Sequence, residues 1–124
     1  MRTIIQSGGP FEEVYGYARA VRVGNVVAVS GSCCTPAAKD GDAYAQAIDA
    51  LGVIAAALEQ AGASIGDVVR TVTYVTDIAD MPLIAKAHSE VFGDIRPAAT
   101  IVEVATLADP AYLVEIQADA VVDA

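Results

Sequence analysis

The sequence predicts an α+β domain in which one mixed β-sheet carries two helices on one face. Three observations support this prediction. The chain has 124 residues, 55% of them are hydrophobic, and segments with strand and helix periodicity follow one another in the order β-β-α-β-α-β-β. Because both helices fall between strands, we expect each to cross the same face of a single sheet. The other face would stay partly apolar, and such a face is often buried by oligomerisation.

The first two strands are expected within residues 17–31, on either side of a turn at Gly24 and Asn25. Valines recur there with the period of two that strands require, at positions 21 and 23 and again at 27 and 29. A short Gly-Asn turn suits a β-hairpin. Residues 32–42 contain Pro, Gly and Asp and are expected to form a loop.

The first helix is predicted over residues 43–63, where apolar side chains recur at steps of three and four. Asp42 is the expected N-cap and Gly62 the expected stop signal. A short turn follows. Residues 68–77 (VVRTVTYVTD) are dense in β-branched side chains, so they predict a strand.

The second helix is predicted over residues 79–94. Asp80 can cap its start, and Pro82 falls in the first turn, where the missing N–H is harmless. Gly93 can end the helix. Two final strands are expected near 98–107 and 112–122, with the turn signal Ala-Asp-Pro between them.

The charge of the chain disfavours nucleic acid as a partner. Its formal net charge is −9, with 16 Asp and Glu against 7 Lys and Arg that are scattered along the sequence. Nucleic-acid binding relies on clustered basic side chains. No apolar run approaches the roughly 20 residues that span a bilayer, and the N-terminus lacks an apolar segment of signal-peptide length. We therefore expect a cytoplasmic protein that does not bind a membrane.

The cysteines do not suggest a metal site. Cys33 and Cys34 are adjacent, whereas metal-binding cysteines are usually spaced by two or more residues and joined by further ligands. A disulfide between neighbours is strained and rare. Since His88 is the single histidine and lies in the middle of a predicted helix, Cys33 has no obvious base beside it. We expect two free, inert thiols in a reducing compartment.

Four segments together resemble one known family. They are GYARAVRVGNVVAVSG (16–31), AGASIGDVVRTVTYVTD (61–77), RPAATIVEVATL (96–107) and LVEIQADAVV (113–122). Each is a weak signal alone, but in this order the chain resembles the RidA/YjgF family, also called the L-PSP endoribonuclease-like family. The resemblance identifies residues 1–124 as a single RidA-like domain.

The resemblance implies a chorismate mutase-like fold and a homotrimer with ligand clefts between adjacent subunits. The best-known members hydrolyse reactive enamines or imines released by pyridoxal-phosphate enzymes, giving keto acids and ammonia. They use no metal and no bound cofactor. A small-molecule substrate bound in an intersubunit cleft is therefore implied for this chain.

The resemblance also implies roles for several residues. Glu115 matches a glutamate late in the last strand that is thought to position the attacking water, so it is the expected catalytic residue. Tyr17 matches a cleft tyrosine in the first strand, and Ser30 and Gly31 match a Ser-Gly pair at the end of the second. All three are expected to contact substrate.

The third motif departs from the family pattern. Family members carry Pro-Ala-Arg-Ser near the fourth strand, and the arginine grips the substrate carboxylate by a two-pronged pairing. Here Ala99 stands at the arginine position, Thr100 at the serine position, and Ile101 where cysteine is frequent. These three positions are expected to line the substrate site without the usual cation.

Two arginines could replace the missing cation. Arg19 lies two residues after Tyr17, so both should point to the same strand face and Arg19 could bind substrate. The alternative for Arg19 is a surface position or an intersubunit salt bridge. Arg96 lies three residues before Ala99, an odd offset that favours a structural role at the end of the preceding helix. That role could be pairing with Glu90 or Asp94, or capping of the helix carbonyls.

Two functions remain open from the sequence. In the first, Glu115 acts as acid or base in hydrolysis of a reactive enamine, imine or related metabolite that is bulkier or less anionic than the usual ones. The alternative for Glu115 is an interface ion pair, for example with Arg19 or Arg22. In the second, the same trimeric scaffold binds a small molecule without catalysis. The ribonuclease name given to some relatives ranks third, because the chain lacks a basic patch.

Overall fold

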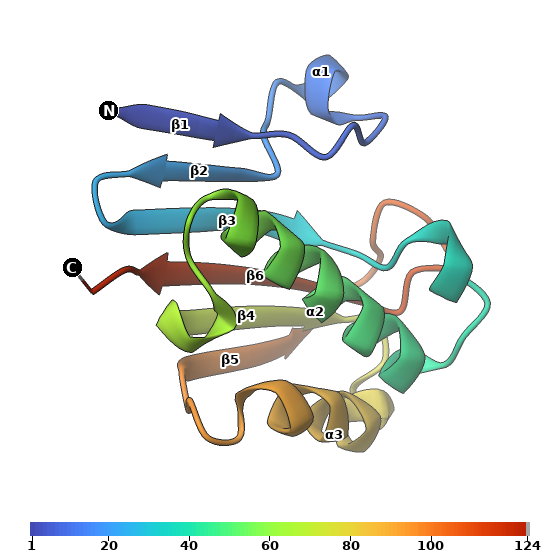
Figure 1. Ribbon diagram of the computed structural model, residues 1–124. Coiled ribbons are helices and arrows are strands. Elements are labelled where there is room, and N and C mark those ends of the chain that lie inside the picture. The colour runs from blue at the N-terminus through green and yellow to red at the C-terminus, as the bar shows by residue number, and fades with distance from the viewer. Residues whose placement is uncertain (124) are drawn as a thin grey trace.

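The computed structural model describes residues 1–123 and contains a six-stranded sheet with the order β1-β2-β3-β6-β4-β5 (Figure 1). The strands are β1 (Arg2–Ile5), β2 (Ala20–Val23), β3 (Val26–Ser32), β4 (Val68–Val75), β5 (Ala98–Glu103) and β6 (Val114–Val121). The helices are α1 (Glu12–Tyr15), α2 (Ala43–Gln60) and α3 (Met81–Phe92), with 3-10 turns at Pro36–Ala38, Ile65–Asp67 and Ile78–Asp80. The predicted α+β class and mixed sheet are confirmed.

The topology of the sheet follows from two helical crossovers. β4 and β5 pair in parallel and are joined by α3, whereas every other neighbouring pair is antiparallel. β6 enters between β3 and β4, so the last strand of the chain occupies the middle of the sheet. This central strand alternates strictly between buried and half-buried residues, as expected for a strand with helices on one face only.

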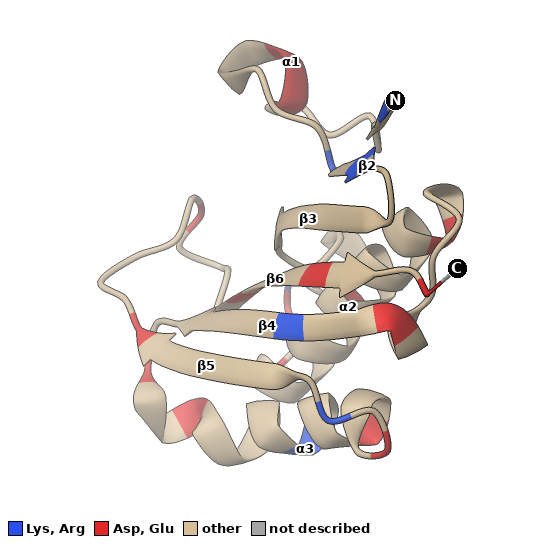
Figure 2. Cartoon of the chain, turned by 90° about the vertical axis from the view of Figure 1, so that its left-hand side faces the viewer, with Lys and Arg blue, Asp and Glu red and all other residues tan. Residues whose placement is uncertain are grey.

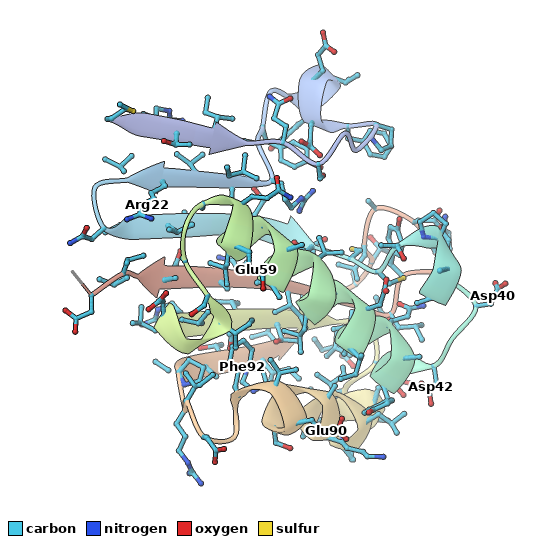
Figure 3. All side chains as sticks on the ribbon, in the orientation of Figure 1. Arg22, Asp40, Asp42, Glu59, Glu90 and Phe92 are labelled. Atoms are coloured by element: carbon cyan, nitrogen blue, oxygen red, sulfur yellow. The ribbon has the colours of Figure 1, made fainter. Side chains whose placement is uncertain are left out.

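The core lies between the sheet and the helices α2 and α3, which cover the same face (Figure 1). Four alanines of α2 are buried, at positions 43, 47, 50 and 57, so this helix approaches the sheet closely. Phe92 at the end of α3 is the largest fully buried side chain and points into this layer (Figure 3). The prediction of two long helices on one face is therefore confirmed.

The ends of α2 and α3 show which of the predicted capping and stop residues act as such. Asp42 caps α2 as predicted, since its carboxylate accepts a hydrogen bond of 2.9 Å from the Ala45 N–H. Gly62 lies just past the end of α2 with φ of +78°, the left-handed conformation that stops helices. The side chain of Asp80 caps nothing, which corrects the prediction. Asp77 instead accepts from the Ala79 N–H at 2.9 Å, one turn earlier.

Two short elements near the N-terminus were not predicted. β1 is an edge strand of four residues, and Ile5 alone is buried. Its sequence, RTII, lacks the alternating apolar pattern that would have predicted a strand. It is held by backbone pairing with β2. α1 is a single turn that ends at Gly16, where φ is +84°.

The strands are shorter than predicted at several ends, and β4 ends at Val75 instead of 77. β2 begins at Ala20, so Tyr17 and Arg19 precede it. β5 ends at Glu103 instead of 107, and β6 begins at Val114 instead of 112. The segment between β5 and β6 is fixed by buried Gln46 of α2, which donates to the Ala111 carbonyl and accepts from the Leu113 N–H, both at 2.9 Å. A side chain from a distant helix therefore holds the segment that leads into β6.

Arg96 occupies the turn between α3 and β5. It is exposed and is the one non-glycine residue among 1–123 with positive φ, at 56°. Its backbone N–H donates to the Phe92 carbonyl at 2.8 Å, so it caps α3 as predicted, but through the backbone. Its side chain forms no ion pair with Glu90 or Asp94, because the one salt bridge among the described residues joins Lys39 and Asp109.

Candidate functional site

A bulge at the end of β3 brings that strand against the segment before β2. The pairing of β3 with β6 shifts register between Val29 and Ser32. Within the bulge, the Ser30 N–H donates to the Arg19 carbonyl at 2.9 Å, and the Ser30 hydroxyl donates to the Ala18 carbonyl at 2.6 Å. Ser30 therefore fixes the backbone next to Gly31, and its hydroxyl is already engaged.

Gly31 lies directly beneath the carboxylate of Glu115. A Cβ atom built on Gly31 would fall 2.2 Å from the nearer carboxylate oxygen, so any other residue would displace this side chain. Glu115 lies between buried Val114 and Ile116 on β6, so it points to the sheet face opposite the helices and stays half-buried. The sequence prediction that Gly31 and Glu115 share a site is consistent with this contact.

Cys33 is a neighbour of Glu115 that the sequence did not assign to the site. The Cys33 Sγ lies 3.4 Å from one Glu115 carboxylate oxygen. Burial, and secondarily the charge of Glu115, raise the pKa of Cys33 to about 12. Cys33 is therefore a protonated thiol that donates to the carboxylate. Such a thiol is a poor nucleophile, in line with the expected inert cysteine.

Arg19 is buried beside this cluster and contacts Tyr17, although neither residue lies in the strand from which the prediction of a shared face was argued. Its guanidinium donates to the Gly31 carbonyl at 2.8 Å, the Ser32 hydroxyl at 3.0 Å and the Tyr17 hydroxyl at 3.1 Å. Only 9% of Arg19 is exposed, and its Nε has no hydrogen-bond partner. Neither Arg19 nor Arg22 pairs with Glu115 among residues 1–123. Arg19 thus carries a buried charge whose direct contacts are neutral. We call Tyr17, Arg19, Ser30, Gly31, Cys33 and Glu115 the carboxylate cluster.

The third motif lies elsewhere in the chain. Ala99, Thr100 and Ile101 are on the edge strand β5, which β4 separates from β6. Ala99 pairs with Thr71 and Ile101 with Thr73, two side chains that are buried beneath the helices. Glu115 points to the opposite face. One chain alone therefore does not bring the predicted motif positions together with Glu115.

A pocket of about 220 Å³ separates β5 from α3. Its walls are Thr73, Met81, Ile84, Ala85, His88, Ser89, Ala99, Thr100 and Ile101. We call it the α3–β5 pocket. All three motif positions belong to its wall. Of these, Ala99 and Ile101 turn their side chains toward the helices.

His88 is a wall of this pocket that the sequence left without a role. Its Nε2 lies 2.8 Å from the Thr71 hydroxyl, and its ring packs on Phe92 with centroids 4.7 Å apart. Burial lowers the pKa of His88 below its ordinary value of 6.5, so the ring is neutral near pH 7. His88 lies four residues after buried Ile84, so the two share one helix face. This spacing is the sequence feature that could have shown that His88 faces the sheet.

The described part of the chain shows neither a metal-binding cluster nor a membrane span. No three side chains of His, Cys, Asp or Glu come together among residues 1–123 in a way that could hold a metal ion. None of the helices described combines the length and the apolar character needed to cross a bilayer. Basic residues are spread over several elements and form no continuous stripe (Figure 2).

Comparisons with known proteins agree with this fold. The model of the family described as Endoribonuclease L-PSP matches residues 10–122. The crystal structure of Rv2704 from Mycobacterium tuberculosis, a member of the YjgF/YER057c/UK114 family, is 48% identical and superposes with a TM-score of 0.93. The match covers 98% of this chain and 100% of that one.

Two curated relatives carry enzyme names. The 3-aminoacrylate deaminase RutC of Acinetobacter baylyi is 36% identical over 104 residues, covering 81% of this chain and 82% of the relative. The 2-iminobutanoate/2-iminopropanoate deaminase of Escherichia coli is 32% identical over 111 residues, covering 85% of this chain and 86% of the relative. The family match over residues 10–122 includes both the carboxylate cluster and β5.

Proposed function

The chain belongs to the RidA/YjgF family, and we propose that it hydrolyses a small reactive imine or enamine with Glu115 as the catalytic residue. The observation that carries this proposal is the Glu115 carboxylate, held above Gly31 with a neutral thiol as its neighbour. Two relatives named as deaminases of imine or enamine acids support the reaction class. A half-buried carboxylate that water can reach can accept a proton from it.

The proposed reaction is hydrolysis of a C=N bond. The imine first takes up a proton from solvent on its nitrogen. Glu115 then accepts a proton from a water molecule while the water oxygen forms a bond to the imine carbon, which gives a neutral amino alcohol. Glu115 returns its proton to the nitrogen, the C–N bond breaks with release of ammonia, and the hydroxyl proton passes to solvent as the carbonyl forms. The sum is imine plus water giving carbonyl compound plus ammonia. An enamine reaches the same pathway after it takes up a proton at carbon to become the imine.

Arg19 acts, in this proposal, as a positioning residue. Its guanidinium already donates hydrogen bonds to three neutral groups, and these bonds link Tyr17 to the backbone of Gly31. Arg19 therefore fixes the backbone of Gly31, the residue in contact with the Glu115 carboxylate. Its remaining N–H groups could still attract an anionic substrate, and a variant described in the Discussion separates the two roles.

The proposal includes a homotrimer, because one chain leaves β5 apart from Glu115. The family resemblance implies clefts between subunits, where β5 of one copy would face the carboxylate cluster of the next. Ala99, Thr100 and Ile101 would then be substrate contacts contributed by the neighbouring copy. We also propose a cytoplasmic location, which fits the two free cysteines.

Hydrolysis can be tested by generating 2-aminoacrylate with a pyridoxal-phosphate enzyme and following keto-acid release. We expect the protein to accelerate release. We expect Glu115→Gln, which keeps the size of the side chain, to lower the enzyme's contribution by about 10²- to 10⁴-fold. Full activity in Glu115→Gln would contradict the catalytic role.

A second function is favoured by one observation, the alanine in place of the motif arginine. If the protein accelerates no imine tested but is stabilised against heat by small ligands, it is a small-molecule binding protein on the same scaffold. The net charge of −9 gives no support to RNA as the ligand.

A further inference from the structure

The α3–β5 pocket differs chemically from the carboxylate-binding site that a motif arginine would create. None of its wall residues is Asp, Glu, Lys or Arg. Its titratable group, His88, has its pKa lowered by burial and its Nε2 within hydrogen-bond distance of Thr71. A carboxylate placed here would lose water and gain no cation, which is strongly unfavourable.

The walls of the pocket are mainly apolar. Ile84 is buried at its base, and Ala99 and Ile101 line the side formed by β5. Ala99 is small, and an arginine at this position would bring a charged side chain of several atoms to the pocket wall. The pocket thus exists in its present form because this position has a methyl group.

The pocket has the size of one ring. Its volume is about 220 Å³. A dry engineered cavity of about 150 Å³ in another protein holds benzene, so this pocket has room for a six-membered ring and a small substituent. The hydroxyl of Ser89 and the imidazole of His88 belong to the wall and can meet one polar substituent.

We propose that the α3–β5 pocket binds an uncharged group of the size of a single ring, and that this group belongs to the substrate. The second clause rests on the proposed function, whereas occupancy of the pocket can be measured without turnover. The proposal thus gives the reaction a substrate class. The substrates are imines that the protein recognises through an apolar ring and not through a carboxylate.

Occupancy can be tested by titrating the intact ¹⁵N-labelled protein with phenol and, separately, with benzoate at pH 7.5. The two probes share a ring and differ in charge. We expect phenol to shift the amide signals of His88, Ala99 and Ile101 saturably, and to bind at least about tenfold more tightly than benzoate, because only benzoate must desolvate a charge. Equal binding of the two probes, or no saturable shift with phenol, would overturn the proposal.

Two matched variants show where phenol binds. Ala85 and Ala56 are both exposed alanines on long helices, and each lines a different pocket. Ala85→Leu places its side chain at the α3–β5 pocket and should weaken phenol binding at least about tenfold through lost space. Ala56→Leu makes the same change beside the pocket that contains Arg19 and should leave binding within about twofold. Equal effects of both variants would refute the assignment.

The outcomes for the pocket and for the reaction are separable. Glu115→Gln should keep phenol binding, because glutamine keeps the size of the side chain and phenol carries no charge that would pair with the carboxylate. If phenol binds as expected but no imine is hydrolysed, the proposed function fails and the ligand class of the pocket stands. If hydrolysis depends on Glu115 but phenol does not bind, the pocket proposal fails alone.

Discussion

The carboxylate cluster and the α3–β5 pocket differ in how strongly their residues constrain one another. In the cluster, each group is positioned by another: Arg19 holds Tyr17 and Gly31, and Cys33 contacts Glu115. In the pocket, a few apolar side chains surround space without an ionised group. The two regions also differ in how they compare with the family pattern that the sequence resembles: Glu115, proposed for water activation, matches that pattern, whereas Ala99, proposed for substrate recognition, departs from it.

The largest effect is expected from Gly31→Ala, which tests how closely the cluster is fitted. The added methyl group would occupy the position of the Glu115 carboxylate. The carboxylate is the mobile end of its side chain, so we expect it to move while the fold stays intact. A displacement of about 1 Å can lower hydrolysis by about 10²-fold. Initial rates of keto-acid release measure this effect.

Gly52→Ala is the matched control for this variant. Gly52 lies within α2, and a Cβ there meets no atom within 4 Å. The control should keep full activity and gain about 0.5–1 kcal/mol of unfolding free energy, since alanine favours a helix. If Gly31→Ala also retains full activity, the close fit beneath Glu115 is irrelevant to function.

The next largest effect is expected from Arg19→Met, which removes the guanidinium but keeps an unbranched side chain. The Gly31 carbonyl and the Ser32 hydroxyl would lose a charged donor. We expect the free energy of unfolding to fall by about 2–4 kcal/mol, measured by urea denaturation.

Arg19→Lys separates the positioning role from substrate binding. Lysine keeps the charge but cannot reproduce the fork that joins Tyr17, Gly31 and Ser32. A positioning role predicts that kcat falls in this variant. Unchanged kcat with a change in KM for anionic substrates alone would instead assign Arg19 to carboxylate binding.

The sequence predicted the elements whose patterns are local and missed those that depend on distant partners. The periodicity of α2 and the β-branched run of β4 located both elements within a few residues. β1 has a single buried residue and exists through pairing with β2, so no pattern within it was informative. The start of β6 was misplaced because Gln46, far away in sequence, holds the segment that leads into it.

The same division applies to the candidate site. Residue spacing placed Tyr17 and Arg19 on one strand face, and they do meet, but in the segment before the strand. Family resemblance assigned Gly31 and Glu115 to one site, and the structure shows them in contact within one chain. The role of Cys33 was not visible, because the bulge in β3 sets its distance from Glu115. His88 was missed since its wall position depends on how α3 lies against β5.

A smaller effect is expected on the reactivity of Cys33. Its pKa of about 12 is caused first by burial and then by Glu115, so little thiolate forms near pH 8 and alkylation should be slow. Glu115→Gln removes the charge that disfavours the thiolate, so alkylation by iodoacetamide should become about tenfold faster for each unit by which the pKa falls. Cys33→Ser gives the background from Cys34, and an unchanged rate in Glu115→Gln would refute the coupling.

The smallest effect is expected from His88 on the pocket side. Its folded pKa lies below the unfolded value of 6.5, so the unfolded chain takes up a proton first as the pH falls. His88 should therefore cost no stability above about pH 7, and its destabilising effect should grow from pH 6.5 down to the folded pKa. Urea unfolding between pH 5 and 8 should show a weaker pH dependence in His88→Gln than in the unchanged protein. Identical profiles would contradict the burial of His88.

The most direct test compares two imines that share a ring and differ by one carboxylate. Oxidation of 2-phenylethylamine and of phenylalanine by suitable oxidases supplies 2-phenylethanimine and 2-imino-3-phenylpropanoate, and ammonia release reports their hydrolysis. We predict that kcat/KM is at least about tenfold higher for the uncharged imine, and that Ala99→Arg shifts this ratio by at least about tenfold toward the carboxylate. A preference for the carboxylate in the unchanged protein, with no response to Ala99→Arg, would contradict the proposed change in recognition.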